Sequence, residues 1–203
     1  MPTTLPLREP IQLSNKLFEM DGFSEDTMSE HQAIYEHFIT RHNDIVTVLN
    51  QVKRLPEHSS STYSPLRVLK VELTFALGGV RNHELYFQQL GGKGGKPSGE
   101  LADQIEQQFG SFDEWAVDMI CTALSSRGWA WFAWDRDGQY LFNHVGDTNN
   151  LYPVWNAAPL IALDMYEHAY YLDFKQDRQT YIKVFLENLD WKVVEERFAA
   201  ATR

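Results

Sequence analysis

The sequence has a single cysteine and no long apolar run. One cysteine in 203 residues excludes a disulfide framework, so we expect a reducing compartment, with Cys121 as a core residue of an apolar helical pattern. Nowhere do about eighteen apolar residues follow one another, and the first ten residues lack an apolar stretch of signal length. These absences favour a cytoplasmic protein that does not enter a membrane.

Basic residues are also scarce. The 18 Lys and Arg stand against 28 Asp and Glu, which gives a formal net charge of −10. Proteins that bind nucleic acid usually present a basic face, and anionic membrane surfaces repel an acidic protein. We therefore expect neither nucleic acid nor a membrane as a partner. The length and the 43% hydrophobic content suffice for one well-packed unit or for two small layers that share a core.

The most informative segment is DMYEHAYY, residues 164–171, which directly follows the apolar run PLIAL at 159–163. The run is typical of a buried strand and the next residues of a helix start, so Asp164 and His168 are predicted to point together into a dry interior. A carboxylate and an imidazole at this spacing are by themselves common as surface pairs, because one helical turn brings them together. The preceding apolar run favours a metal site instead.

Two further histidines lie in apolar helical patterns. His83 follows the pair Gly78-Gly79, which allows close backbone approach, and His31 shares a helical face with apolar side chains. Either one could be a core histidine whose ring nitrogens are satisfied by hydrogen bonds. Together with Asp164 and His168, however, they make a set of three imidazoles and one carboxylate, which suits iron, manganese or zinc.

Three ordered motifs run through the chain. D-x-Y-E-H-A-Y lies at 164–170, G-G-x-x-N-H at 78–83 and G-W-x-W at 128–131. With them the chain resembles the iron/manganese superoxide dismutase family over about residues 24–198, and Tyr166 stands where the family usually has tryptophan. The resemblance implies an enzyme that converts superoxide to dioxygen and hydrogen peroxide. The alternative is a metal-binding protein of the same fold with weak or no dismutase activity.

The resemblance also implies one iron or manganese ion per subunit, with a fifth coordination position for water or hydroxide. The implied ligands are His31, His83, Asp164 and His168. For the first ligand, His37 competes with His31 in the same predicted helix. The sequence T-M-x-x-H that ends at His31 resembles the family's entry to this ligand, so we prefer His31. Sequence alone does not separate iron from manganese, because both metals prefer nearly the same ligands.

Around the implied metal the chain departs from the family pattern. Family members place a glutamine or histidine beside the metal-bound solvent, from one of two positions. The first is Gly79 here; the second, fifteen residues before the ligand aspartate, is Asn149, with His144 as a nearby alternative. The family's gateway tyrosine falls on Ile39, and Tyr35 is either the nearest phenol that could replace it or a core aromatic. Tyr35, Asn149 and His144 are therefore the candidate catalytic residues.

The residues beside His168 suggest a partner surface. Glu167 and Tyr171 are polar groups in an otherwise apolar segment. In the family, the glutamate at this place bonds the last ligand histidine of the neighbouring subunit, which implies a homodimer or a larger assembly. A local salt bridge is the alternative. Because superoxide is an anion, nearby cations matter, and Arg178 resembles an arginine near the family's substrate funnel or else is a surface arginine of a helix start.

The overall pattern predicts an α+β fold. An N-terminal antiparallel hairpin of two helices, at 24–55 and 64–90, is expected to pack on a C-terminal domain that holds a three-stranded antiparallel sheet with helices. The glycine-rich segment 91–99 lacks the residue order of a phosphate loop and is expected to be a flexible linker. We place the domains at 1–92 and 93–203, with the metal site between them.

Within the second domain, two strands are expected on either side of a turn at 135–138, and a third strand ends at Asp164. Helices are expected in the remaining periodic segments, which are 100–109, 115–124, 167–173 and 177–201.

Overall fold

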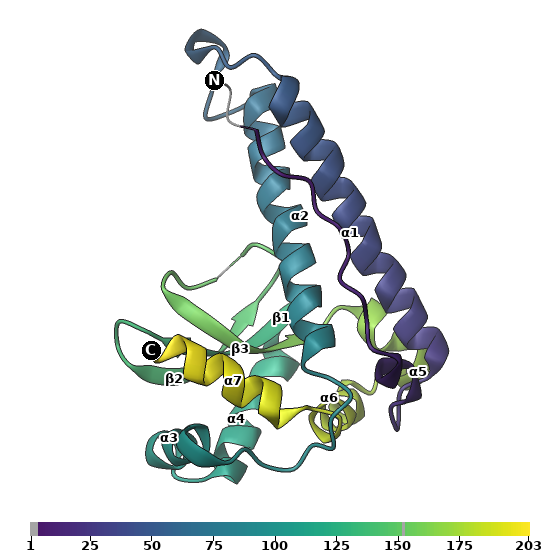
Figure 1. Ribbon diagram of the computed structural model, residues 1–203, viewed down its shortest axis with the longest axis vertical. Coiled ribbons are helices and arrows are strands. Elements are labelled where there is room, and N and C mark those ends of the chain that lie inside the picture. Colours follow the sequence, from purple (N-terminus) through teal and green to yellow (C-terminus); the bar gives the residue numbers. More distant parts are fainter. Residues whose placement is uncertain (1–3, 152) are drawn as a thin grey trace.

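The molecule consists of a long helical hairpin that rises from a base of sheet and helices (Figure 1). This computed structural model describes residues 4–151 and 153–203. Within those residues, no helix combines the length and the apolar character that crossing a membrane requires.

Helices α1 (Glu25–Gln51) and α2 (Pro65–Gln88) form the hairpin. Ser24 and Ser64 cap them, since each side-chain oxygen accepts a hydrogen bond from a backbone N–H of the first turn. The predicted antiparallel hairpin is confirmed. Helix α1 ends four residues earlier than expected, and a short 3-10 turn at Pro56–His58 begins the connection to α2.

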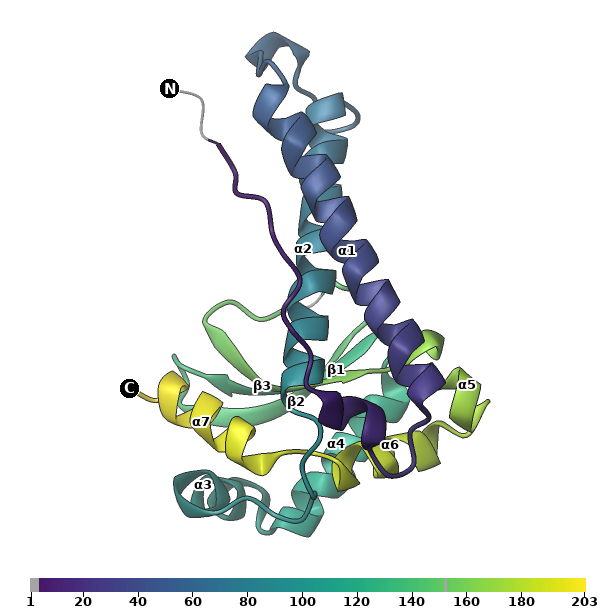
Figure 2. The same cartoon turned by 45° about the vertical axis from the view of Figure 1, so that its right-hand side comes forward.

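A three-stranded antiparallel sheet with strand order β2-β1-β3 forms the centre of the base (Figure 2). Its strands are β1 (Trp129–Asp135), β2 (Tyr140–Gly146) and β3 (Ala157–Asp164). The first six residues of β1 are all buried, as expected for a central strand whose residues are almost continuously apolar. Trp129 pairs with Asp164 in the β1–β3 register, so the end of β3 lies beside the start of β1.

Helices pack against the sheet, and the α+β prediction is confirmed. Those that contact its strands are α3 (Gly99–Phe109), α4 (Phe112–Ser125) and α7 (Trp191–Ala201). The remaining helices of the base, α5 (Tyr171–Phe174) and α6 (Arg178–Glu187), pack on other helices. Trp115 of α4 joins these layers. Its ring centroid lies 5.1 Å from that of Phe132 on β1 and 5.3 Å from that of Trp191 on α7. Such aromatic packing fixes the helices against the sheet.

Two local predictions were wrong. The glycine-rich segment is held in place: Gly92 and Gly94 donate backbone hydrogen bonds to the carbonyls of Asn188 and Leu189. A Cβ on either glycine would collide with the backbone that precedes α7, so these glycines permit close approach and do not make the segment flexible. Cys121 lies on the exposed side of α4 and is not a core residue.

The N-terminal segment lies along the hairpin (Figure 2). Asn50 and Asn43 of α1 each make paired hydrogen bonds with one residue of this segment, Leu5 and Arg8 respectively. These contacts hold the segment along α1, and three residues after Arg8 the backbone N–H of Ile11 donates a hydrogen bond to the hydroxyl of Tyr35.

Candidate metal centre

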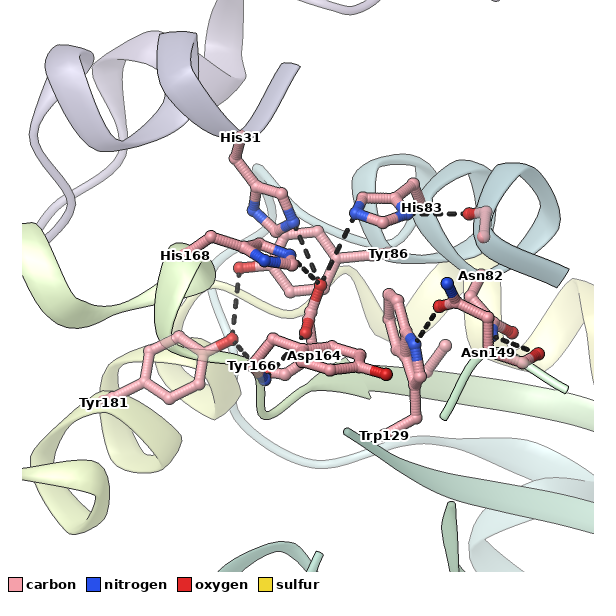
Figure 3. A network of polar contacts seen from close by, with 12 residues as sticks. His31, Asn82, His83, Tyr86, Trp129, Asn149, Asp164, Tyr166, His168 and Tyr181 are labelled. Atoms are coloured by element: carbon pink, nitrogen blue, oxygen red, sulfur yellow. Dashed lines mark hydrogen bonds and ion pairs between the residues drawn. The ribbon is translucent and has the colours of Figure 1, made fainter. Parts of the chain in front are cut away.

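Four side chains converge where the hairpin meets the sheet (Figure 3). They come from α1, from α2, from the last residue of β3 and from the 3-10 turn Glu167–Ala169. Their ligand atoms all lie within 4.8 Å of one another. We call this group the His/Asp cluster; its members are His31, His83, Asp164 and His168. His37, the competing candidate for the first ligand, lies on the exposed side of α1 and outside the cluster.

Asp164 lies at the centre of the cluster. Its Oδ2 is 3.1 Å from Nε2 of His31, 3.0 Å from Nε2 of His168 and 3.6 Å from Nε2 of His83. Its other oxygen, Oδ1, accepts a hydrogen bond of 2.9 Å from the backbone N–H of Tyr166. One oxygen is thus held by the main chain while the other points to where the three rings meet.

His83 shows how the fold fixes the orientation of a ring. Its Nδ1 lies 2.7 Å from the backbone oxygen of Gly79, one turn earlier in α2. Because a carbonyl only accepts, Nδ1 carries the proton and Nε2 presents a lone pair to the cluster. Nε2 is buried without a hydrogen-bond partner among the described residues. A buried polar nitrogen of this kind needs a partner, and a metal ion would supply it.

The cluster's electrostatics favour the charge state that a metal requires at three of its four members, Asp164, His83 and His31. Burial alone raises the pKa of Asp164, but His168 and His31 outweigh it and hold that pKa below its ordinary value. Burial lowers the pKa of His83 to about 3, and it also lowers that of His31. For His168, burial lowers the pKa, but the charge of Asp164 and the hydrogen bond to it together outweigh burial. The pKa of His168 is therefore raised above its ordinary value. An anionic carboxylate and neutral imidazoles are the metal-binding forms.

Asn149 lies beside the cluster and is held by Trp129 (Figure 3). Nε1 of Trp129 donates a hydrogen bond of 2.8 Å to Oδ1 of Asn149, and both residues are buried. Nδ2 of Asn149 is buried without a partner among the described residues. The loop that carries Asn149 can approach α2 closely because Gly78 has no side chain. A Cβ at this position would collide with the backbone oxygen of Asn149. The site therefore contains a fixed and unused hydrogen-bond donor.

Comparison with known proteins decides the family. A model of iron/manganese superoxide dismutases, C-terminal domain, matches residues 97–197. The iron superoxide dismutase of Aquifex aeolicus is 38% identical over 91% of this chain and 88% of its own length. The chain belongs to the iron/manganese superoxide dismutase family. The manganese superoxide dismutase of Mycolicibacterium smegmatis and the iron superoxide dismutase of Mycobacterium tuberculosis are each 35% identical over 86% of this chain and 82% of their own length.

In this superoxide dismutase family member, the hydroxyl of Tyr35 bonds groups outside the His/Asp cluster. The hydroxyl accepts a hydrogen bond of 2.9 Å from the backbone N–H of Ile11 and lies 3.2 Å from the acceptor Oε1 of Glu84. The Tyr35 ring stacks towards His83 at 6.3 Å between centroids. The prediction that this phenol replaces the gateway tyrosine is therefore not supported, because the N-terminal segment engages its hydroxyl.

Phe38 lies near the site, although no sequence motif pointed to it. Its ring centroid is 5.3 Å from that of His83, and the ring occupies the space where a Cβ of Gly79 would stand. The family pattern places the gateway position on Ile39, which is buried in the hydrophobic core. The signal that could have identified Phe38 is Gly79, because a glycine inside a helix often marks a close neighbour.

His144 lies outside the His/Asp cluster. Its ring packs on Trp131 at 5.1 Å and on Phe142 at 4.9 Å between centroids. It lines a cavity of about 860 Å³ between α2 and the loop before β3. Burial lowers the pKa of His144 to about 4, so the ring is neutral at physiological pH. The structure thus separates His144 from the proposed ligands, whereas it keeps Asn149 beside them.

The cluster opens to the exterior at His168, whose side chain is 25% exposed while the other three members are fully buried. Tyr166, which replaces the family's tryptophan, stacks on this ring at 5.4 Å with an interplanar angle of 13°. Arg178 and Arg127 line a cavity next to His168. Arg178 also donates hydrogen bonds to main-chain carbonyls at the end of α4. Glu167 lines the same cavity and Oδ2 of Asp147 lies 3.8 Å from Arg127, so the arginines bring positive charge to this opening beside two carboxylates.

Proposed function

We infer that this chain is a metal-dependent superoxide dismutase that converts superoxide to dioxygen and hydrogen peroxide. The observation that carries the inference is the His/Asp cluster, which holds four donor atoms within 4.8 Å and includes Nε2 of His83, which is buried without a hydrogen-bond partner among the described residues. One iron or manganese ion per subunit fits this donor set. When bound, the ion supplies one-electron cycling between the +3 and +2 states. Some of the relatives are named as iron superoxide dismutases and others as manganese superoxide dismutases.

The protein's part is to hold the donors in the right place and charge state. We propose that His31, His83 and His168 each offer Nε2 and that Asp164 offers Oδ2. The hydrogen bond from the backbone N–H of Tyr166 to Oδ1 supports this orientation of Asp164. The full burial of three donors excludes bulk water, which strengthens every charge interaction within the site.

We also propose that Asn149 takes the role that a glutamine or histidine has in other family members. Because Oδ1 accepts a hydrogen bond from Trp129, the amide is held in place, and its buried Nδ2 remains available as a hydrogen-bond donor. Such a donor can bind solvent or a small anion beside the cluster and can control a proton there. We assign no proton transfer to Tyr35, whose hydroxyl bonds Ile11 and Glu84, or to His144, whose ring packs on Trp131 outside the His/Asp cluster.

The assembly, the compartment and the domain division are further proposals. We propose a homodimer or larger assembly built around Glu167, His168 and Tyr171; in support, Glu167 is exposed and Tyr171 is 44% exposed beside the solvent-accessible histidine. Light scattering should then give a lower mass for Glu167→Ala than for the wild type.

We also propose a cytoplasmic location and a division into two domains, at 1–92 and 93–203. The family match to residues 97–197 supports the domain at 93–203.

The function is tested by loading the protein separately with iron and with manganese, then measuring metal per subunit and superoxide dismutation on the same sample. One metal per subunit with fast turnover in either form is the expected result. Stoichiometric metal without turnover in both forms would contradict the inference and favour a metal-binding protein of the same fold. Among the described residues, no feature of the site favours that alternative.

A further inference from the structure

The free edge of β3 is covered by side chains. In the sheet order β2-β1-β3, β3 has a strand neighbour on one side only. Because alternate residues of a strand direct their backbone groups to the same side, the carbonyls of Leu160, Ala162 and Asp164 all face the free edge. Unpaired carbonyls buried in this position would be costly.

Three side chains supply the missing hydrogen bonds. Nη1 of Arg197 donates to Leu160 O at 2.8 Å, Nε2 of Gln89 donates to Ala162 O at 2.5 Å, and the hydroxyl of Tyr181 donates to Asp164 O at 2.6 Å (Figure 3 shows the last). We call this set the β3 edge ladder; its donors are Arg197, Gln89 and Tyr181. They come from α7, from the C-cap of α2 and from α6 respectively.

Gln89 behaves like a residue of a neighbouring strand. Besides donating to the carbonyl of Ala162, its amide accepts a hydrogen bond of 3.1 Å from the backbone N–H of the same residue. Arg197 fixes the amide's orientation, since Nη1 donates to Oε1 of Gln89 at 3.1 Å and Nη2 donates to Leu85 O on α2 at 3.0 Å. Burial lowers the pKa of Arg197 to about 10, which leaves it charged at neutral pH.

The ladder joins two elements that each carry a member of the His/Asp cluster. Gln89 follows His83 by six residues at the end of α2, and Ala162 precedes Asp164 by two residues on β3. Tyr181 holds the carbonyl of Asp164 itself. A slide of β3 along its axis would break all of these bonds together, and it would also carry the Asp164 carboxylate away from the histidine rings.

We propose that the β3 edge ladder positions Asp164 against His83 and thereby controls how tightly the site retains its metal. This proposal rests on the proposed function for the presence of iron or manganese. No motif or comparison assigns a role to Gln89, Arg197 or Tyr181. They are positioning residues, because each acts on the ligands through the main chain of β3 or α2.

The test uses Tyr181→Phe and Gln89→Met in the full-length, manganese-loaded protein. Each replacement keeps most of the buried shape while it removes ladder hydrogen bonds. The matched control is Asn188→Leu: Asn188 is 6% exposed and its side chain donates to two main-chain carbonyls, Asp21 O and Val184 O, neither of which belongs to a ligand or to β3.

We measure the rate of manganese release to excess chelator, the visible absorption spectrum of the loaded protein, and the Tm of the metal-free protein. Loss of groups that orient metal ligands typically lowers metal affinity roughly 10- to 100-fold. We expect this loss to lie in the release rate, so the two ladder variants should release metal faster than the wild type by about that factor and should shift the absorption band. The control should lower the Tm of the metal-free protein without either change.

The proposal is overturned if the ladder variants and the control change the release rate equally, or if the ladder variants lower only the Tm. Metal release and spectra do not depend on turnover. A wild type that retains manganese but lacks dismutase activity would therefore defeat the proposed function while the comparison of variants still decides the ladder's role. A wild type that binds neither manganese nor iron would overturn both.

Discussion

The hydrogen bond between Trp129 and Asn149 offers a quantitative test of the proposed role of Asn149. Asn149→Leu keeps the side chain's approximate size but removes both the donor Nδ2 and the acceptor for Trp129 Nε1. The buried indole N–H then loses its partner, at a cost of about 1–3 kcal/mol in the free energy of unfolding. For a chain of this length that corresponds to a fall in Tm of roughly 2–12 °C.

The effect on activity has a separate magnitude. If Nδ2 of Asn149 binds solvent or a reacting anion, its loss removes a hydrogen bond to a charged group, worth about 1.5–3 kcal/mol. Since 1.36 kcal/mol is a factor of ten, kcat/KM should fall roughly 10- to 150-fold. Trp129→Phe removes the constraint on Asn149 but leaves its amide present, so the loss of activity should be smaller than for Asn149→Leu.

A double-mutant cycle on the manganese-loaded protein measures the coupling. Pulse radiolysis gives the dismutation rate of the wild type, the two single variants and the double variant, with metal content determined for each sample. If Trp129 acts through Asn149, Trp129→Phe should have little further effect in the Asn149→Leu background. Additive losses in log rate, or full activity in metal-replete Asn149→Leu, would refute the reasoning.

Three other predictions concern the metal and the loop. Asp164→Ala should abolish stoichiometric metal, because it removes the one anionic donor and leaves three imidazoles; elemental analysis checks this, and retained metal would disprove the assignment. Metal affinity should fall as pH drops below the raised pKa of His168, tenfold per pH unit for one proton, whereas His83, with its pKa lowered to about 3, adds no competition near pH 6. A chelator titration across pH 5–7 in which the logarithm of the metal affinity changes by nearly three per pH unit would contradict this. Gly78→Ala should lower Tm by overpacking against Asn149 O, although Gly→Ala in a helix ordinarily stabilises; a raised Tm would show that the loop moves freely.

The ligand candidates could be read from the sequence because metal chemistry restricts both residue types and spacing. Asp164 and His168 follow a buried strand, and His83 lies in a motif whose glycines bring other chain segments close. The apolar periodicity likewise predicted both hairpin helices. In these cases the signal lies within a few residues of the feature itself.

What the sequence did not predict depends on contacts between distant segments. Tyr35 was a reasonable choice by helical spacing, but Ile11, from a segment 24 residues earlier, bonds its hydroxyl. The ring of Phe38 contacts His83 only because the two helices pack at Gly79. The β3 edge ladder unites three helices on one strand edge, and no local pattern around Gln89 distinguishes it from a surface glutamine.

Anomalous diffraction from a crystal of the metal-loaded protein tests the central claim most directly. Data collected on either side of the manganese and iron absorption edges locate each metal and identify it. The account predicts one strong peak per subunit, bounded by Nε2 of His31, His83 and His168 and by Oδ2 of Asp164. A full metal complement with its peak elsewhere, and none between these four atoms, would contradict it.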